Sequence, residues 1–350
     1  MNHIERVKAA YRFEGPDCLP LEIHDVVHLY DAYDTLDPAT VKLVPGVASF
    51  DSLRVTYHWT FTEEGVNAEG ERIRRDEWGC LQRVPESDQT AYDVIEKPLS
   101  KPGAIGGYAF PDPSISDPFF ERTKATIAEH YPDRFICGYV DPGPLLIAFN
   151  LYGYDGLLMR LHDNLDEVVA VVRQIAEYQK AIIDRWASIG VHMVAIIDEF
   201  AGTDGLMFSP ALWREHFADI YANMFGHIRS HGLLAGCLFD GDISAILDDY
   251  LAIGPDVIEI VQPNTVGIET WAEKLRGKVA CKASVDMMGT LATGTPADCR
   301  REARKLVEAL ATPEGGFAGI SLRWHRPEYP KPNVSAVAEA FNEFRGPALG

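Results

Sequence analysis

Carboxylate and amide side chains follow three short apolar runs in the middle of the chain. VHMVAIIDEF contains Asp198 and Glu199, LLAGCLFDGD contains Asp240 and Asp242, and VIEIVQPN contains Gln262. A carboxylate that ends an apolar segment needs a partner or a ligand, because an unpaired charge in a dry environment is costly. We therefore expect Asp198, Glu199 and Asp240 to be catalytic, as general acids or bases or as metal ligands. The alternative role is capping of a loop or helix, and Asp242 fits that alternative.

The three runs are the strands that would position these groups. Each run is rich in Val, Ile and Leu, as expected of a strand buried on both faces, and an amphipathic segment of helical length follows each. Repeats of this unit predict an α/β fold, a single (β/α)8 TIM barrel over residues 1–350, with the polar strand ends on one rim. The sequence shows seven such strands and a doubtful eighth near IGGYAF, residues 105–110.

The pattern changes between residues 52 and 84. RVTYHWTF and ERIRRDEWGCLQRV alternate between apolar and polar residues, and NAEGE between them is typical of a turn. This predicts an N-terminal β-hairpin extension packed beside or over the barrel. Within it, Trp59 is a candidate wall for an aromatic substrate, and His58 is a candidate binding group, although plain packing explains Trp59 equally well. An apolar face of the hairpin is a candidate surface for a homodimer.

Other substrate-binding candidates lie at further predicted strand ends. His24 ends the first strand and Tyr139 a later one, while Gln262 offers a neutral donor and acceptor. Arg323 and His325 follow the last strand, where a cation could hold a carboxylate or phosphate. A zinc ion is a further candidate, with the ligands Asp198, Glu199, Asp240 and His325. The remaining histidines, including His216, His227 and His231, fall on helical segments and are expected to be ordinary surface or packing residues.

The composition restricts the partners. The chain of 350 residues carries a net charge of −20, from 52 acidic and 32 basic side chains. So acidic a surface argues against nucleic acid or an anionic membrane as partner. No apolar run reaches transmembrane length, and MNHIERVKAA lacks the apolar core of a signal peptide. The six cysteines show no CxxC spacing, so we expect reduced thiols and a cytoplasmic protein.

Several segments resemble the uroporphyrinogen decarboxylase superfamily, in order along nearly the whole chain. They include ERVKAAYRFEGPDCLP, RRDEWGCLQR, NLYGYDGLLMRLHDN, IIDEFAGTDGLMFSPALWREHFADIY, LFDGDISAILDDYLAIGPDVIEIVQP and VDMMGTLATGTPADCRREARKLV. The resemblance implies a (β/α)8 barrel with its cleft at the C-terminal rim. True uroporphyrinogen decarboxylases carry an arginine-rich motif of the form RQAGR near the N-terminus. This chain reads LEIHDVVHLYD there and has no arginine between Arg12 and Arg54, which argues against a substrate with many carboxylates.

The chain looks closer to the corrinoid-linked methyltransferase branch of that superfamily. Thiol-using members of the branch carry His-x-Cys after one strand and Cys after the last, which together bind zinc. Here the corresponding positions read Leu238-Phe239-Asp240 and, near the last strand, about Arg323, so that zinc–thiolate pattern is missing. The resemblance implies transfer of a methyl group between a small methylated donor and cobalamin on a separate corrinoid protein. An aryl methyl ether is the first candidate for the donor. The alternatives are transfer to tetrahydrofolate, decarboxylation of a uroporphyrinogen-like carboxylated substrate, and a non-catalytic binding barrel.

Overall fold

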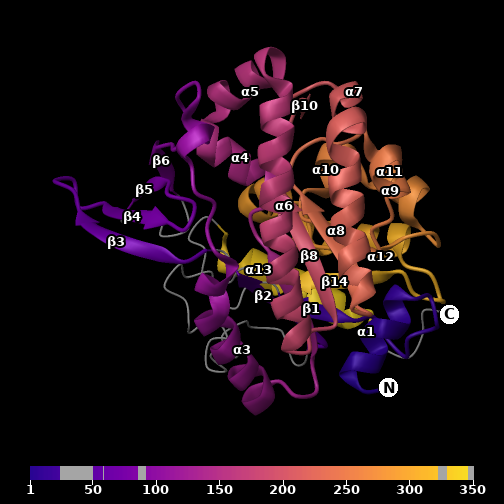
Figure 1. The fold of residues 1–350 in the computed structure, drawn as a ribbon. Helices are drawn as coiled ribbons and strands as arrows, with labels where there is room; N and C mark the ends of the chain where they lie inside the picture. The colour runs from indigo at the N-terminus through magenta and orange to yellow at the C-terminus, as the bar shows by residue number, and fades with distance from the viewer. Residues whose placement is uncertain (24–49, 58, 86–91, 322–328, 346–350) are drawn as a thin grey trace.

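Eight parallel strands close into a barrel surrounded by helices (Figure 1). The computed structural model describes residues 1–23, 50–57, 59–85, 92–321 and 329–345. In order around the barrel the strands are β1 (Leu21–Ile23), β14 (Phe317–Ser321), β13 (Ala280–Ala283), β12 (Val257–Ile260), β11 (Leu234–Phe239), β8 (Met193–Asp198), β7 (Phe135–Val140) and β2 (Ser52–Tyr57). The predicted (β/α)8 barrel is confirmed.

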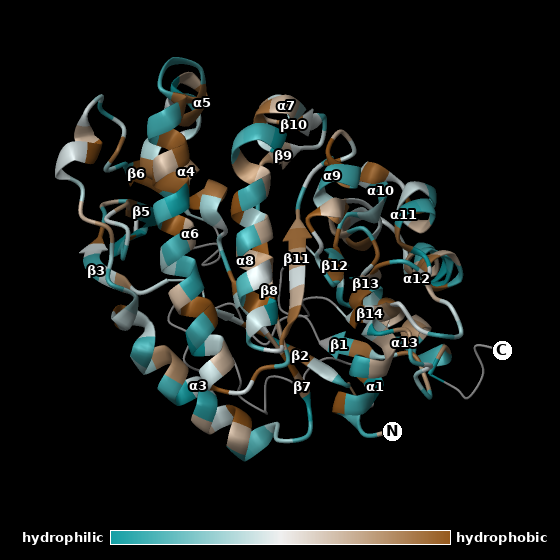
Figure 2. Ribbon diagram, turned by 45° about the vertical axis from the view of Figure 1, so that its right-hand side comes forward, coloured by the Kyte–Doolittle hydropathy of each residue, from teal (hydrophilic) through white to brown (hydrophobic). Residues whose placement is uncertain are grey.

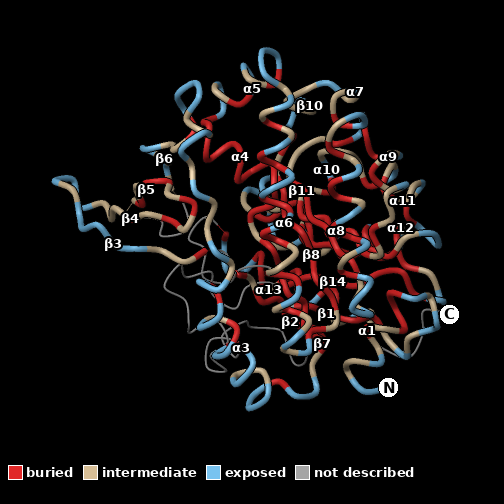
Figure 3. Tube along the Cα trace, in the orientation of Figure 1, coloured by how far each residue is buried: buried red, intermediate tan, exposed pale blue. Residues whose placement is uncertain are grey.

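The barrel strands lie in the centre of the molecule because helices cover their outer face. Every residue of β7, β8, β12, β13 and β14 is buried, and the buried segments in Figure 3 concentrate on the strands. Strands that are buried on both faces carry mostly apolar side chains on both faces, which explains the runs of Val, Ile and Leu in the sequence. No helix in the described part of the chain combines the length and the apolar character that crossing a membrane requires.

Most of the covering helices are amphipathic, and their ribbons carry both hydrophilic and hydrophobic segments in Figure 2, whereas α4 (Pro144–Tyr152) is buried along its whole length. The longest, α6 (Leu165–Ser188), buries residues at helical spacing, among them Val168, Val171, Val172 and Ile175. The other helices in the described ranges are α1 (His3–Tyr11), α3 (Asp117–His130), α5 (Tyr154–Asp163), α7 (Pro210–Leu212), α8 (Ala218–Ser230), α9 (Leu247–Ala252), α10 (Pro263–Val266), α11 (Ile268–Leu275), α12 (Pro296–Leu310) and α13 (Lys331–Glu343). Short 3-10 turns span Ala104–Gly107 and Pro113–Ser116, and π-helical turns span Trp213–Phe217 and Met287–Leu291.

The predicted hairpin starts later than expected and is larger. Residues Ser52–Tyr57 form β2, which pairs in parallel with β1 and β7 and is the eighth barrel strand. Its alternation arises because Arg54 reaches Glu259 inside the barrel, whereas Leu53, Val55 and Tyr57 belong to the apolar core outside it. The prediction of an eighth strand near residues 105–110 is wrong, because Ala104–Gly107 forms a 3-10 turn.

A four-stranded antiparallel sheet extends the barrel on one side (Figure 1). Its strands are β3 (Phe61–Val66), β4 (Arg72–Asp76), β5 (Leu81–Val84) and β6 (Asp93–Glu96). The sheet is tied to the barrel by Glu77, whose carboxylate accepts hydrogen bonds of 2.6 Å from both Tyr57 and Tyr178. A second, two-stranded sheet of β9 (Ala201–Gly202) and β10 (Gly205–Leu206) follows β8.

Candidate functional site

The register of neighbouring strands brings several acidic residues to one rim. Asp198 at the end of β8 is level with Phe239 of β11, and Ile196 is level with Val140 of β7. Glu199 and Asp240, which directly follow β8 and β11, therefore leave the barrel at the same end. Asp141, which follows β7, joins them. From the sequence, Asp141 was not a site candidate, because an aspartate before a proline commonly shapes a turn.

The acidic surroundings of Glu199 change its protonation. Burial raises the pKa of Glu199 to about 8, and the charges of Asp240, Asp141 and Asp198 act in the same direction. A carboxyl group with that pKa carries its proton at neutral pH and can give it away. The described residues thus place three predicted catalytic carboxylates together and distinguish one of them as an acid.

Asp198 has a different environment from Glu199. Its side chain is fully buried, and each carboxylate oxygen accepts two hydrogen bonds. The donors are the backbone N–H groups of Leu145, Leu146 and Glu199, and the Tyr221 hydroxyl at 2.5 Å. Burial raises the pKa of Asp198 to about 6, although these hydrogen bonds oppose the rise. With both oxygens engaged, Asp198 holds the start of α4 against β8, which favours a positioning role over a reactive one.

A close backbone approach fixes the loop that carries Asp240. Gly241 has a φ of +87°, and a Cβ there would lie 2.4 Å from the carbonyl oxygen of Ala201. The next residue, Asp242, donates its backbone N–H to the carbonyl of Gly202 at 2.8 Å. Only glycine permits both the left-handed conformation and this contact. The loop after β11 is therefore held against β9, beside Glu199.

Glu199 lines a cleft with a volume of about 510 Å³. One wall comes from β6 and its flanks, and the other from α4 and the start of α5. The lining residues are Tyr92, Asp93, Val94, Lys97, Leu146, Phe149, Asn150, Tyr154 and Glu199. Sequence reasoning missed all of them except Glu199, because they are neither at barrel strand ends nor in a recognisable motif.

The cleft combines aromatic surfaces with the cation Lys97. Phe149 and Tyr154 stack with their ring centroids 4.5 Å apart, and Asn150 donates to the Tyr92 hydroxyl at 3.2 Å. Lys97 donates one hydrogen bond of 2.8 Å to the carbonyl of Val94. An ammonium group has three donors, so two remain for a ligand. Such a cleft suits a flat aromatic molecule with a negative substituent.

Three of the predicted substrate-binding residues occupy other places. Trp59 is buried and packs edge-on against Phe61 and Tyr92, at 6.0 and 5.8 Å between centroids, so it supports the aromatic wall from behind. Gln262 borders a separate cavity of only about 10 Å³ beside Trp271. Tyr139 is fully buried inside the barrel and donates its hydroxyl hydrogen to Glu259. His24, His58, Arg323 and His325 lie outside the described residues, so their roles stay predictions.

Tyr139 belongs to a charged network below the rim that sequence reasoning missed. Lys282 donates to Glu22 and to Tyr139, and it lies 3.1 Å from Glu259. The Arg54 guanidinium lies 3.4 Å from Glu259 and 3.7 Å from Asp141 at the rim. Glu22, Arg54, Glu259 and Lys282 are all buried. The signal in the sequence was a charged residue inside each of several apolar strands.

The predicted rim zinc does not fit the described residues well. Asp198 has no oxygen left for a metal, since each accepts two hydrogen bonds. Among the described residues, three or more His, Cys, Asp or Glu ligands converge at one place only, and that place is not the rim. His325, the fourth proposed ligand, is outside the described part. We therefore assign no step to a metal at the rim.

Comparison with known proteins identifies a family and several solved structures with a similar fold. A family model described as uroporphyrinogen decarboxylase (URO-D) matches residues 86–344. A methyltransferase from Methanosarcina mazei has a TM-score of 0.75 at 19% identity, covering 99% of this chain and 100% of that one. At that identity the match shows the shared fold. An intracellular xylanase from Thermoanaerobacterium saccharolyticum reaches a TM-score of only 0.43 at 13% identity, covering 94% and 98% of the two chains. No curated protein matches the sequence.

Proposed function

The chain belongs to the uroporphyrinogen decarboxylase family, and we propose that it is a methyltransferase that removes the methyl group from a small aryl methyl ether. The observation that carries the proposal is Glu199, a carboxyl group with a pKa of about 8 in a cleft with aromatic walls. The methyltransferase from Methanosarcina mazei, which shares the fold over the whole chain, supports this branch of the family.

The proposed reaction needs an acid because a phenoxide or alkoxide is a poor leaving group. When the bond between the methyl carbon and the ether oxygen breaks, the electron pair stays on the oxygen, which takes the proton of Glu199. The products are a phenol and a methylated acceptor, and the resulting Glu199 carboxylate regains its proton from solvent. A positioned acid of this kind contributes roughly 10²- to 10⁴-fold to the rate.

The other residues of the cleft hold the ether and keep Glu199 protonated. The rings of Tyr92 and Tyr154 offer stacking surfaces for the donor's aryl group, and the buried ring of Phe149 supports Tyr154 by stacking against it. Asp141 and Asp240 disfavour the charged form of Glu199 by repulsion. The two further N–H donors of Lys97 favour an ether with a carboxylate on its ring, such as a methoxybenzoate.

The methyl acceptor must come from outside this chain in the proposal. A corrinoid protein docked over the rim would supply a cobalt centre as acceptor, and tetrahydrofolate is the alternative acceptor. Neither alternative changes what the residues of this chain do. They bind the ether and protonate the leaving oxygen.

Decarboxylation is the second candidate, because the family name points to it and an acid with a pKa of about 8 could also protonate a carbanion after loss of carbon dioxide. A porphyrinogen with many carboxylates would require several cations. Among the described residues that line the cleft, Lys97 is the one cationic side chain. The small number of cations in the cleft therefore favours a methyl ether over a porphyrinogen as the substrate.

The test uses free cob(I)alamin as the acceptor and a methoxybenzoate as the donor, under anaerobic reducing conditions. We expect methylcobalamin to form, measured by absorbance, with an equal amount of phenol measured by chromatography. Tetrahydrofolate in place of cobalamin distinguishes the two acceptors. Failure with both acceptors, together with carbon dioxide release from a porphyrinogen carboxylate, would overturn the proposal in favour of decarboxylation.

A further inference from the structure

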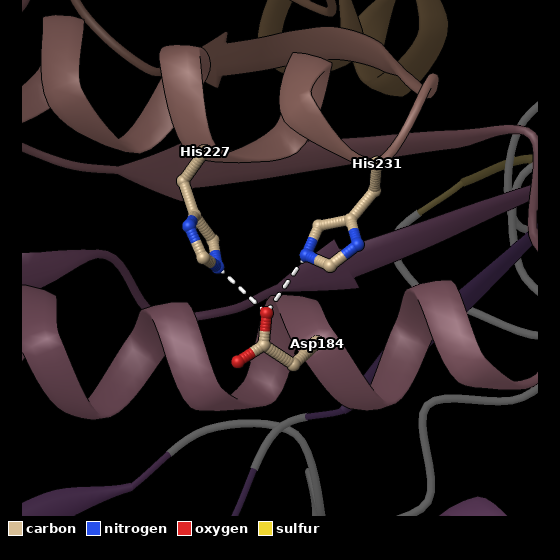
Figure 4. A group of neighbouring side chains, drawn as sticks. All are labelled: Asp184, His227 and His231. Atoms are coloured by element: carbon tan, nitrogen blue, oxygen red, sulfur yellow. Dashed lines mark hydrogen bonds and ion pairs between the residues drawn. The ribbon is translucent and has the colours of Figure 1, made fainter.

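Two histidines and an aspartate converge on the outer surface of the barrel (Figure 4). His227 lies in the last turn of α8, and His231 caps that helix at its C-terminal end. Asp184 comes from the neighbouring helix α6. One oxygen of Asp184 lies 2.7 Å from Nε2 of His227 and 2.8 Å from Nε2 of His231. These three residues are called the surface triad below.

The donor atoms of the surface triad suit a transition metal. Two histidines four residues apart lie on the same side of a helix, and here their ring centroids are 5.2 Å apart. All three ligand atoms lie within 4.8 Å of one another. Imidazole nitrogen and carboxylate oxygen bind zinc at about 2.0–2.2 Å, which sets neighbouring ligand atoms about 3.4 Å apart in a tetrahedron. Lengthening each of the two contacts to Asp184 by about 0.6–0.7 Å would therefore admit the ion.

The direction of the side chains separates this group from an ordinary ion pair. Both histidines direct the same ring nitrogen, Nε2, at a single carboxylate oxygen of Asp184 (Figure 4). The three possible ligand atoms therefore lie next to one another. The side chains are 51%, 28% and 33% exposed for Asp184, His227 and His231. An ion can reach them from solvent, and the side chains have room to adjust. The net charge of −20 raises the local concentration of cations around the protein.

The surface triad lies at the end of the barrel opposite the cleft. Helices α6 and α8 run antiparallel to the strands, so their C-terminal ends lie away from the rim that carries Glu199 (Figure 1). Metal chemistry on the substrate is therefore not its role. A metal bound there would join α6 to α8, two neighbouring helices of the outer ring.

We propose that Asp184, His227 and His231 bind one zinc ion or a similar late first-row divalent metal, with water as a fourth ligand, and that the ion clamps α6 to α8. The proposal is independent of the methyl transfer reaction. Zinc fits best because it accepts a tetrahedral set of two nitrogens and a carboxylate.

The test titrates chelator-treated protein with Zn²⁺ alone, by calorimetry, and follows Tm with and without the ion. We expect one saturable site and a rise in Tm of a few degrees on binding. His227→Ala, His231→Ala and Asp184→Asn should each weaken binding by at least about tenfold and abolish the rise in Tm. His216→Ala is the matched control, since His216 lies in the adjoining π-helical turn and pairs with Glu215 instead.

The variants also separate this site from a metal at the rim. Exposed side chains tolerate substitution, so circular dichroism without zinc should show that all four variants fold. Zinc binding that survives in His227→Ala but is lost in Glu199→Gln would place the ion at the rim and overturn the proposal. Absence of saturable binding in the wild-type protein, or several weak equivalents unaffected by the triad variants, would overturn it as well.

Discussion

Glu199 is the residue on which the proposed reaction depends. Glu199→Gln keeps the size and hydrogen-bonding capacity of the protonated side chain but has no proton to transfer. We expect kcat for ether demethylation to fall by roughly 10²- to 10⁴-fold, with KM nearly unchanged. Glu129→Gln, an exposed substitution on α3, is the control and should leave kcat unchanged. A large rise in KM with constant kcat would assign Glu199 to binding instead.

The raised pKa of Glu199 predicts how the rate depends on pH. The acid form is the active one, so the rate should fall as the pH rises through about 8. Asp240→Asn removes a nearby negative charge, which makes the Glu199 carboxylate easier to form. The falling limb of the profile of kcat/KM should therefore move to lower pH in that variant. An unmoved limb would show that another group titrates there.

The same pKa has a consequence for stability. In the unfolded chain Glu199 titrates near its ordinary value of 4.5, and in the folded protein its pKa is about 8. Between these values the folded state holds a proton that the unfolded state has lost, so this group reduces stability as the pH rises. Glu199→Gln should accordingly raise Tm relative to the wild type at about pH 9 and change it little at about pH 4. Equal Tm differences at both pH values would contradict the assignment.

At the scale of elements, Asp198 joins β8 to α4, which forms one wall of the cleft. Tyr221→Phe removes the hydroxyl that donates to this buried carboxylate. We expect a loss of about 1.5–3 kcal/mol in the free energy of unfolding, measured by urea denaturation, and a higher KM because α4 is held less firmly. Tyr11→Phe is the control, because the buried Tyr11 hydroxyl has no hydrogen-bond partner among the described residues. That substitution should be neutral or stabilising.

At the scale of the molecule, Lys282 balances two carboxylates inside the barrel. Burial lowers the pKa of Lys282, but Glu22 and Glu259 raise it more, so it stays charged. Lys282→Met would leave Glu22 and Glu259 facing each other with less compensation, and we expect urea denaturation to show a loss of about 3–5 kcal/mol in stability. Lys274→Met is the control. Its ion pair with Asp248 is exposed to solvent, so that substitution should leave the free energy of unfolding nearly unchanged.

The fold was largely predictable because the barrel imposes a local pattern. Seven strands carry mainly apolar runs, and the polar residues that end them place Asp198, Glu199 and Asp240 at one rim from the sequence alone. The eighth strand, β2, was assigned to a hairpin, since its alternation reflects a charged barrel interior that only the closed barrel reveals. The interior network itself depends on contacts such as that of Glu22 with Lys282, 260 residues apart.

The cleft and the surface triad were beyond sequence reasoning for a related reason. The cleft wall combines Tyr92 and Lys97 from the extension with Phe149 and Tyr154 from α4 and α5, and no spacing connects them. His227 and His231 show the helical spacing of a metal pair, yet they were expected to be ordinary surface residues. Asp184 lies 43 residues before His227, and only the packing of α6 against α8 brings it near.

In the proposed reaction, the appended sheet β3–β6 separates the selection of the substrate from the chemistry. Its last strand, β6, is largely exposed and supplies one wall of the cleft, whereas the acid directly follows a barrel strand buried throughout. Substitutions around Asp93 to Lys97 can therefore alter which ring substituents fit without disturbing the barrel that fixes Glu199. Proteins that share this barrel can therefore change substrate through substitutions in that one small sheet. A laboratory library of variants restricted to the sheet would sample new methyl donors with little effect on folding.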